Sequence, residues 1–89
     1  METILNGSIF SGNVDLDSRE FVLTSVKEMN TQTVLNEKQL DAIYHYLNKV
    51  VHQEEYHVLT LYDQLPVRLK NDEITLLLSE LDKIKAMLN

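Results

Sequence analysis

The chain has 89 residues, of which 44% are hydrophobic, so it suits one small globular domain over residues 1–89 and is too apolar for a disordered segment. Its 14 acidic and 8 basic residues give a net charge of −6, which opposes binding to nucleic acid or to an anionic membrane. The absence of cysteine excludes disulfides and thiol chemistry, and the lack of a secretory signal or a membrane-length apolar run predicts a cytoplasmic protein.

The low content of turn-forming residues indicates the fold class. Two glycines and one proline are too few for the many tight turns of a β-sandwich or a β-barrel. We therefore predict an all-α, three-helix domain that is built on a long antiparallel helical hairpin.

Residues 1–15 differ from the rest and are predicted to form an N-terminal arm. Short apolar runs at 3–5 and 8–10 flank Asn6 and Gly7, a dipeptide that suits a two-residue hairpin turn. Such a short hairpin is marginal unless it docks on the helices or pairs with another chain. A small β-hairpin and an irregular apolar arm remain the two alternatives.

The first helix is predicted over residues 17–30. Asp17 can cap its N-terminus, and Glu20 three residues later completes a capping box. The residues that follow give the helix an apolar side: Phe21, Val22, Val26 and Met29.

The second helix is predicted over residues 36–65. Asn36 and Gln39 form another capping box, and Pro66 marks the far end because the residue before a proline avoids the α region. A break near 53–56 is the alternative. The apolar stripe of this helix comprises Leu40, Ile43, Leu47, Val50, Val51, Val58 and Leu61.

The third helix is predicted over residues 71–88, with Asn71 as its cap. Its apolar residues recur with the 3,4 spacing of a helix-pairing seam: Ile74, Leu77, Leu81, Ile84 and Leu88. The short connection over 67–70 predicts that the second and third helices pack as an antiparallel hairpin.

Glu54 lies within the apolar stripe of the second helix. A carboxylate there must be paired, protonated or at an interface, because an isolated buried charge is costly. Glu54 and His57 also have the Glu-x-x-His spacing of di-iron bundles, which need two copies and further glutamates. They are weak metal candidates that a homodimer would complete, and no cofactor is predicted.

A second face of the same helix is predicted to bind a partner. Tyrosine, histidine and leucine on one surface are typical of protein interfaces. The residues, spaced by 7, 4, 3 and 4, are His45, His52, Tyr56, Leu59 and Asp63. The alternative is that the first helix or the N-terminal arm covers this face.

No nucleophile motif and no phosphate-binding loop is recognisable in the sequence, so we predict that the protein is not an enzyme. The predicted function is a small acidic protein-binding module that acts as a regulator, inhibitor or adaptor of another protein and forms a homodimer. The alternatives are a structural homo-oligomer that assembles a four-helix bundle, and a metal-binding bundle based on Glu-x-x-His.

Overall fold

Six strands and two helices make up the parts of the chain that the computed structural model describes, namely residues 2–51, 56–60 and 66–88. In chain order the elements are β1 (Glu2–Asn6), β2 (Phe10–Asp15), β3 (Glu20–Val26), β4 (Met29–Asn36), α1 (Glu37–Val50), β5 (Tyr56–Thr60), β6 (Pro66–Lys70) and α2 (Asn71–Leu88). The predicted all-α class is therefore wrong, because the fold combines helices with antiparallel sheets.

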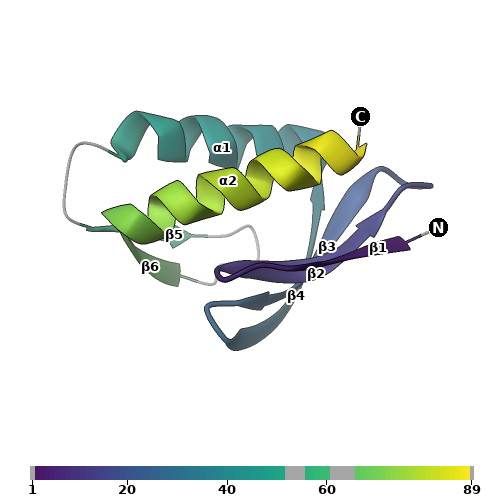
Figure 1. Cartoon of the computed structure of the whole chain (residues 1–89), viewed down its shortest axis with the longest axis horizontal. Coiled ribbons are helices and arrows are strands. Elements are labelled where there is room, and N and C mark those ends of the chain that lie inside the picture. Colours follow the sequence, from purple (N-terminus) through teal and green to yellow (C-terminus); the bar gives the residue numbers. More distant parts are fainter. Residues whose placement is uncertain (1, 52–55, 61–65, 89) are drawn as a thin grey trace.

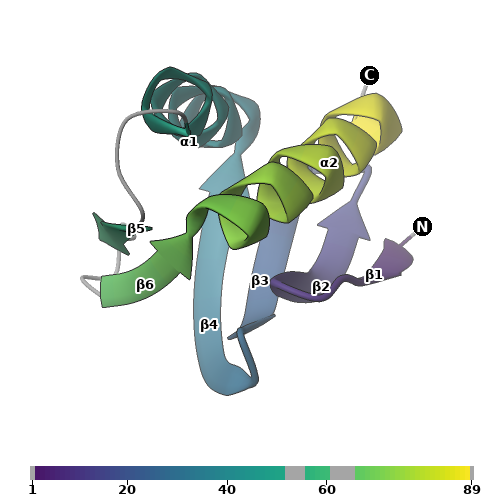
Figure 2. The same cartoon turned by 60° about the vertical axis from the view of Figure 1, so that its left-hand side comes forward.

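The strands form two antiparallel sheets. β1 to β4 make a four-stranded sheet in the order β1-β2-β3-β4, and β5 pairs with β6 in a separate two-stranded sheet. Both helices lie on one face of the large sheet and run in opposite directions (Figure 1). The β5–β6 hairpin lies beside the helices at one end of the molecule (Figure 2).

The segment predicted as the first helix, 17–30, instead contains a turn, β3 and the start of β4. Phe21 and Leu23 are fully buried while Val22 between them is not, which is the two-residue period of a strand. The β-branched Val22, Thr24 and Val26 add to the preference for a strand. The supposed capping box lies in the β2–β3 turn, where the Asp15 carboxylate accepts hydrogen bonds from nearby backbone N–H groups.

The N-terminal segment takes the hairpin alternative. β1 pairs with β2 in a register that sets Asn6 opposite Ser11, so the loop spans 7–10 rather than the expected two residues. The Gly7 N–H donates to the Phe10 carbonyl oxygen at 2.9 Å, and neither glycine has positive φ. Asn6 and Gly7 thus mark the turn, but the turn type differs from the predicted one.

The second helix begins as predicted and ends much earlier. Gln39 N–H donates to Asn36 Oδ1 at 2.8 Å and Asn36 N–H donates to Gln39 Oε1 at 3.0 Å, which confirms this capping box. α1 ends at Val50, and residues 56–60 form β5 instead of continuing the helix. Tyr56 and the β-branched Val58 favour a strand, and pairing with β6 supplies the backbone partners.

The third helix has the predicted bounds, because α2 spans Asn71–Leu88, but the predicted cap is wrong: Asn71 Oδ1 has no hydrogen-bond partner among the described residues. Its five seam residues are all buried, as are Leu40, Ile43 and Leu47 of α1. The two helices do not follow each other directly, since β5 and β6 lie between them in the chain. The seam closes a core that the helices share with the inner face of the large sheet.

Three residues other than glycine adopt positive φ, namely Arg19 (57°), Lys27 (49°) and Glu28 (72°). Lys27 and Glu28 are the central residues of the β3–β4 hairpin, in which Val26 pairs with Met29. Positive φ at both central positions is typical of the type I′ turn, which favours asparagine and glycine. The left-handed conformation costs residues other than glycine and asparagine about 1–2 kcal/mol each. Contacts between this turn and the rest of the protein must therefore offset that cost.

Leu81→Ala tests the core. Leu81 is fully buried in the seam, and truncating a buried leucine costs about 2–5 kcal/mol of unfolding free energy. Leu76→Ala, on the same helix and 42% exposed, is the matched control and should cost less than about 1 kcal/mol. Urea denaturation measures both, and equal losses would mean that the seam is not the buried face.

Candidate functional site

The predicted partner-binding stripe does not exist as a helix face. His45 is exposed on α1, whereas Leu59 lies on β5 and is 7% exposed. Tyr56 is the first residue of β5, and His52 and Asp63 fall outside the described residues. The stripe assumed one continuous helix, and the end of α1 at Val50 separates its members.

The structure does not test the two metal candidates as a pair. Glu54 falls outside the described residues, so its predicted environment stays a prediction. His57 lies on β5, with Nε2 3.1 Å from the carbonyl oxygen of Val50. One ring nitrogen of His57 is therefore engaged in linking the end of α1 to β5.

A shallow hollow of about 330 Å³ lies where α1 meets β5. Among the described residues it is lined by Tyr46, Val58, Leu59 and Thr60. Tyr46 and Val58 are 42% and 53% exposed. Of the residues predicted to bind a partner, the hollow includes Leu59, which is buried. The hollow contains no charged side chain among these residues and indicates no chemistry.

The outer face of the large sheet, turned away from both helices, carries the most extensive candidate surface. One residue from each strand forms a row across it, which we call the apolar row: Ile4, Asn13, Val22 and Val34. Ile4 is 68% exposed and Val34 49%. An antiparallel sheet with one face in water normally places polar residues there, and these aliphatic residues depart from that pattern.

Polar residues flank the apolar row on both sides. The acidic row lies two residues away along the strands and comprises Asp15, Glu20 and Asn36. On the other side, where bulges interrupt the pairing of the strands, the outer face carries uncharged polar residues: Asn6, Ser11, Thr24 and Gln32. The outer face therefore has an acidic end, an apolar middle and an uncharged polar end.

The Asp15 carboxylate at the acidic end is held by hydrogen bonds within the β2–β3 turn. A hydrogen bond from the Ser18 backbone N–H, followed by one from its hydroxyl, lowers the pKa of the exposed Asp15 carboxyl. Asp17 N–H also donates to Asp15 Oδ1, at 3.0 Å. Asp15 therefore stabilises the β2–β3 turn and supplies negative charge to the outer face.

On the opposite side of the sheet, α2 is joined to the β1–β2 loop by a buried acid, Glu80, which is 4% exposed. Its carboxylate accepts hydrogen bonds from three consecutive backbone N–H groups. Ser8 donates to Oε2 at 2.7 Å, Phe10 to Oε1 at 2.8 Å, and Ile9 lies 3.2 Å from both oxygens. Such charge-assisted bonds offset the cost of burying the carboxylate.

The approach of Glu80 requires a glycine at position 7. A Cβ at Gly7 would lie 2.5 Å from Glu80 Cδ and 2.5 Å from the carbonyl oxygen of Phe10. Both distances are far below van der Waals contact, and the backbone oxygen cannot move aside cheaply. Close packing against Glu80 and Phe10, and not a positive φ, therefore requires glycine at position 7.

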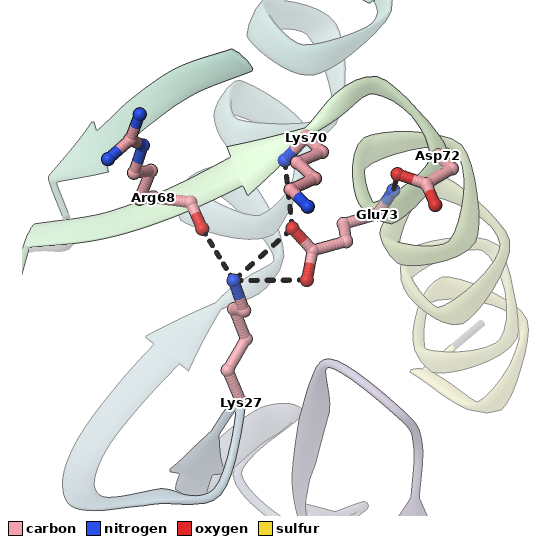
Figure 3. Close-up of polar contacts among 5 residues, drawn as sticks. All are labelled: Lys27, Arg68, Lys70, Asp72 and Glu73. Carbon is pink, nitrogen blue, oxygen red and sulfur yellow. Dashed lines mark hydrogen bonds and ion pairs between the residues drawn. The ribbon is translucent and has the colours of Figure 1, made fainter. Parts of the chain in front are cut away.

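A second contact joins the β3–β4 turn to the start of α2 (Figure 3). Lys27 Nζ donates to the carbonyl oxygen of Arg68 at 2.8 Å and lies 3.0 Å from Glu73 Oε2. Glu73 Oε1 also accepts the Lys70 backbone N–H at 2.9 Å. This hydrogen bond and the one from Lys27 lower the pKa of the Glu73 carboxyl.

The third contact joins the β2–β3 turn to the far end of α2. Arg19 Nη2 donates to the carbonyl oxygen of Leu88 at 2.7 Å, and its Nε pairs with Glu37 Oε1 at 2.7 Å. A cation at the C-terminal end of a helix is favoured by the helix dipole. The three turns of the sheet thus each hold α2, which makes the sheet and its outer face a rigid support.

Glu80 is a structural position whose burial the sequence interpretation did not identify. It follows Leu77 by three residues and precedes Ile84 by four, so helical spacing places it on the buried stripe. The signal was the same as the one that singled out Glu54. It could have been recognised from periodicity, although the backbone N–H partners could not.

Compared with protein-family profiles, curated protein sequences and solved structures, the chain gives no match. Neither helix within the described ranges is long and apolar enough to cross a membrane.

Glu80→Gln tests the buried carboxylate. The glutamine amide keeps the shape but turns an N–H donor toward a loop that offers only donors, so unfolding free energy should fall by roughly 2–3 kcal/mol. Gly7→Ala should cost a similar amount through the clash with Glu80. Asp82→Asn, exposed on the same helix, is the control and should stay within about 0.5 kcal/mol. Chemical denaturation measures all three, and a neutral Glu80→Gln would contradict the arrangement.

Glu73 should make stability depend on acid pH. Its folded-state pKa lies below its ordinary value of 4.5, so its contribution is present above that value and is lost as the pH falls through the lowered pKa. Glu73→Gln should therefore be less stable than the natural chain at pH 7, and the difference should shrink toward pH 2–3. Urea melts at both pH values measure this, with Glu28→Gln in the neighbouring turn as the control. A difference that is independent of pH would exclude the ion pair as its origin.

Proposed function

We propose that the protein is a non-enzymatic binding module that acts as a regulator, inhibitor or adaptor of another protein through the outer face of its four-stranded sheet. The observation that carries this proposal is that Ile4 and Val34 are exposed in one row of this face. A sheet face that contacts only water normally carries polar residues, so exposed aliphatic residues indicate a surface for a partner.

The order of the rows specifies the chemistry of a matching partner. The apolar row, with Ile4, Val22 and Val34, requires an apolar strip on the partner. The acidic row favours lysine or arginine at the neighbouring position, because complementary charge sets orientation and speeds encounter. A basic partner also suits the net charge of −6.

The rigidity of the sheet supports a binding function. α2 is held near its start by Lys27, near its middle by the β1–β2 loop and at its end by Arg19. A face that needs little ordering loses less conformational entropy on binding.

Charge substitutions on the outer face test the proposal. The tagged chain is used to capture proteins from lysate of the source organism, beside Ile4→Glu and Val34→Glu. Both substitutions place a carboxylate in the apolar row, so capture of the partner should fall at least tenfold, a loss of about 1.4 kcal/mol of binding free energy.

Leu76→Glu is the matched control, because Leu76 is 42% exposed on α2 and lies away from the outer face. Circular dichroism and urea melts of each variant check that the fold is retained. A partner that binds all three variants equally, or is lost with Leu76→Glu alone, contradicts the proposed surface.

A further inference from the structure

We propose that the partner adds an extended, basic segment to the β1 edge of the four-stranded sheet, antiparallel to β1. This inference rests on the proposed function, because it names the shape and the charge of the partner segment that binds. The added segment continues the sheet by one strand and extends the apolar row beyond Ile4.

β1 is an edge strand whose outer side is open in the described part of the chain. It pairs with β2 on one side, and no described strand pairs with its other side. It lies on the side of the sheet away from the β5–β6 hairpin (Figure 2). β4 forms the other edge, but there Lys27 of the β3–β4 turn donates to the Arg68 carbonyl oxygen of β6. β1 is therefore the edge that a further strand can reach.

The hydrogen bonds of the β1–β2 hairpin identify the backbone groups that face this edge. The Gly7 N–H donates to the Phe10 carbonyl oxygen, and these two residues continue the register of the hairpin. Hydrogen-bonded and non-hydrogen-bonded pairs alternate along an antiparallel ladder. Thr3 and Leu5 therefore direct their N–H and C=O groups toward β2, whereas those of Ile4 between them point to the open edge.

β1 lacks the features that usually keep an edge strand from pairing. Natural edges often carry lysine, proline or a bulge, and residues 2–6 contain no lysine and no proline. The register with β2 runs from Glu2 to Asn6 without a shift. Ile4, at the centre of the strand, is 68% exposed. An exposed aliphatic residue on such an edge favours an added strand with an aliphatic residue opposite it.

The charge at one end of β1 specifies a basic occupant. Glu2 pairs with Asp15, and Asp15 pairs with Glu20, so the register aligns three acidic residues on neighbouring strands. The guanidinium of Arg19, in the adjoining turn, is directed to α1 and α2 instead. Opposite charges on paired strands are favourable, and like charges are destabilising. A lysine or arginine opposite Glu2 is therefore preferred, and a second acidic chain is disfavoured.

A synthetic peptide with blocked ends tests the added strand: Thr-Ser-Thr-Val-Thr-Lys-Thr. When it lies antiparallel to β1, its valine is opposite Ile4 and its lysine is opposite Glu2. Nuclear magnetic resonance titration of the full chain measures binding and amide exchange. In the free chain the Ile4 N–H should exchange much faster than those of Thr3 and Leu5, and saturating peptide should slow its exchange at least tenfold.

N-methylated peptides distinguish strand addition from contact between side chains alone. In the antiparallel register the valine N–H points to Ile4, and the N–H of the threonine after it points away. N-methylation of the valine should therefore weaken binding at least tenfold, whereas N-methylation of that threonine should change it less than twofold. Equal effects of the two methylations overturn the added strand.

A peptide of the same composition tests the charge and the direction. Thr-Lys-Thr-Val-Thr-Ser-Thr places its lysine opposite Asn6 in the antiparallel register and should bind about threefold more weakly. Glu2→Lys should reverse the charge preference, so that a peptide with glutamate in place of lysine binds this variant more tightly than the original peptide does. Equal affinity of the natural chain for the two lysine peptides overturns the basic residue opposite Glu2.

The outcomes separate this inference from the proposed function. Val34→Glu, on β4 at the other edge, should leave peptide binding unchanged within about twofold while it reduces partner capture. Absence of peptide binding, with partner capture still lost in Val34→Glu, rejects only the added strand. Peptide binding as expected, with partner capture unchanged in Ile4→Glu and Val34→Glu, rejects only the outer face. Protection of the Ile4 N–H that rises with chain concentration alone means that a second copy occupies the edge, and it overturns the basic segment.

Discussion

The Glu80 carboxylate is the constraint on which the arrangement of the sheet and α2 depends. It is the one buried acid among the described residues, and three consecutive N–H groups of the β1–β2 loop point at it. A buried charge tolerates little displacement of its partners, since each lost hydrogen bond leaves a group without water. The conformation of the β1–β2 loop, the glycine at position 7 and the position of α2 therefore depend on one another. Lys27 and Arg19 then fix the two ends of the helix.

Contacts with α2 and with the residues just before it also hold the strained backbone of two turns. Arg19 and Lys27 both have positive φ, and both send their cations to an end of α2. The Lys27 N–H also donates to the Ile9 carbonyl oxygen at 2.9 Å, beside the loop that holds Glu80. Tertiary contacts thus override local preference at these residues. This rigid inner side allows the outer face to carry exposed aliphatic residues without distortion of the sheet.

The sequence was sufficient to predict α2 and the start of α1. The seam from Ile74 to Leu88 and the Asn36 capping box are local patterns that the structure confirms. The prediction for 17–30 was wrong because the spacing of Asp17 and Glu20 also suits a turn, and the alternation of Phe21 and Leu23 about Val22 is that of a strand. β5 could not be separated from a helix, since its strand depends on pairing with β6. The outer face depends on register across four strands, which the sequence alone does not specify.

The three turn contacts also bear on how the protein reaches its fold. Residues 8 to 10 are separated from Glu80 by 70 to 72 positions, and Arg19 from Leu88 by 69. While the chain is still being made, β1 to β4 can pair, yet their inner face has no cover and their loop N–H groups have no carboxylate until α2 emerges. Contacts of such long range slow folding, because the loop entropy is lost before the contacts form. The N-terminal sheet should therefore depend on chaperones or on rapid completion of synthesis to avoid pairing with other nascent chains.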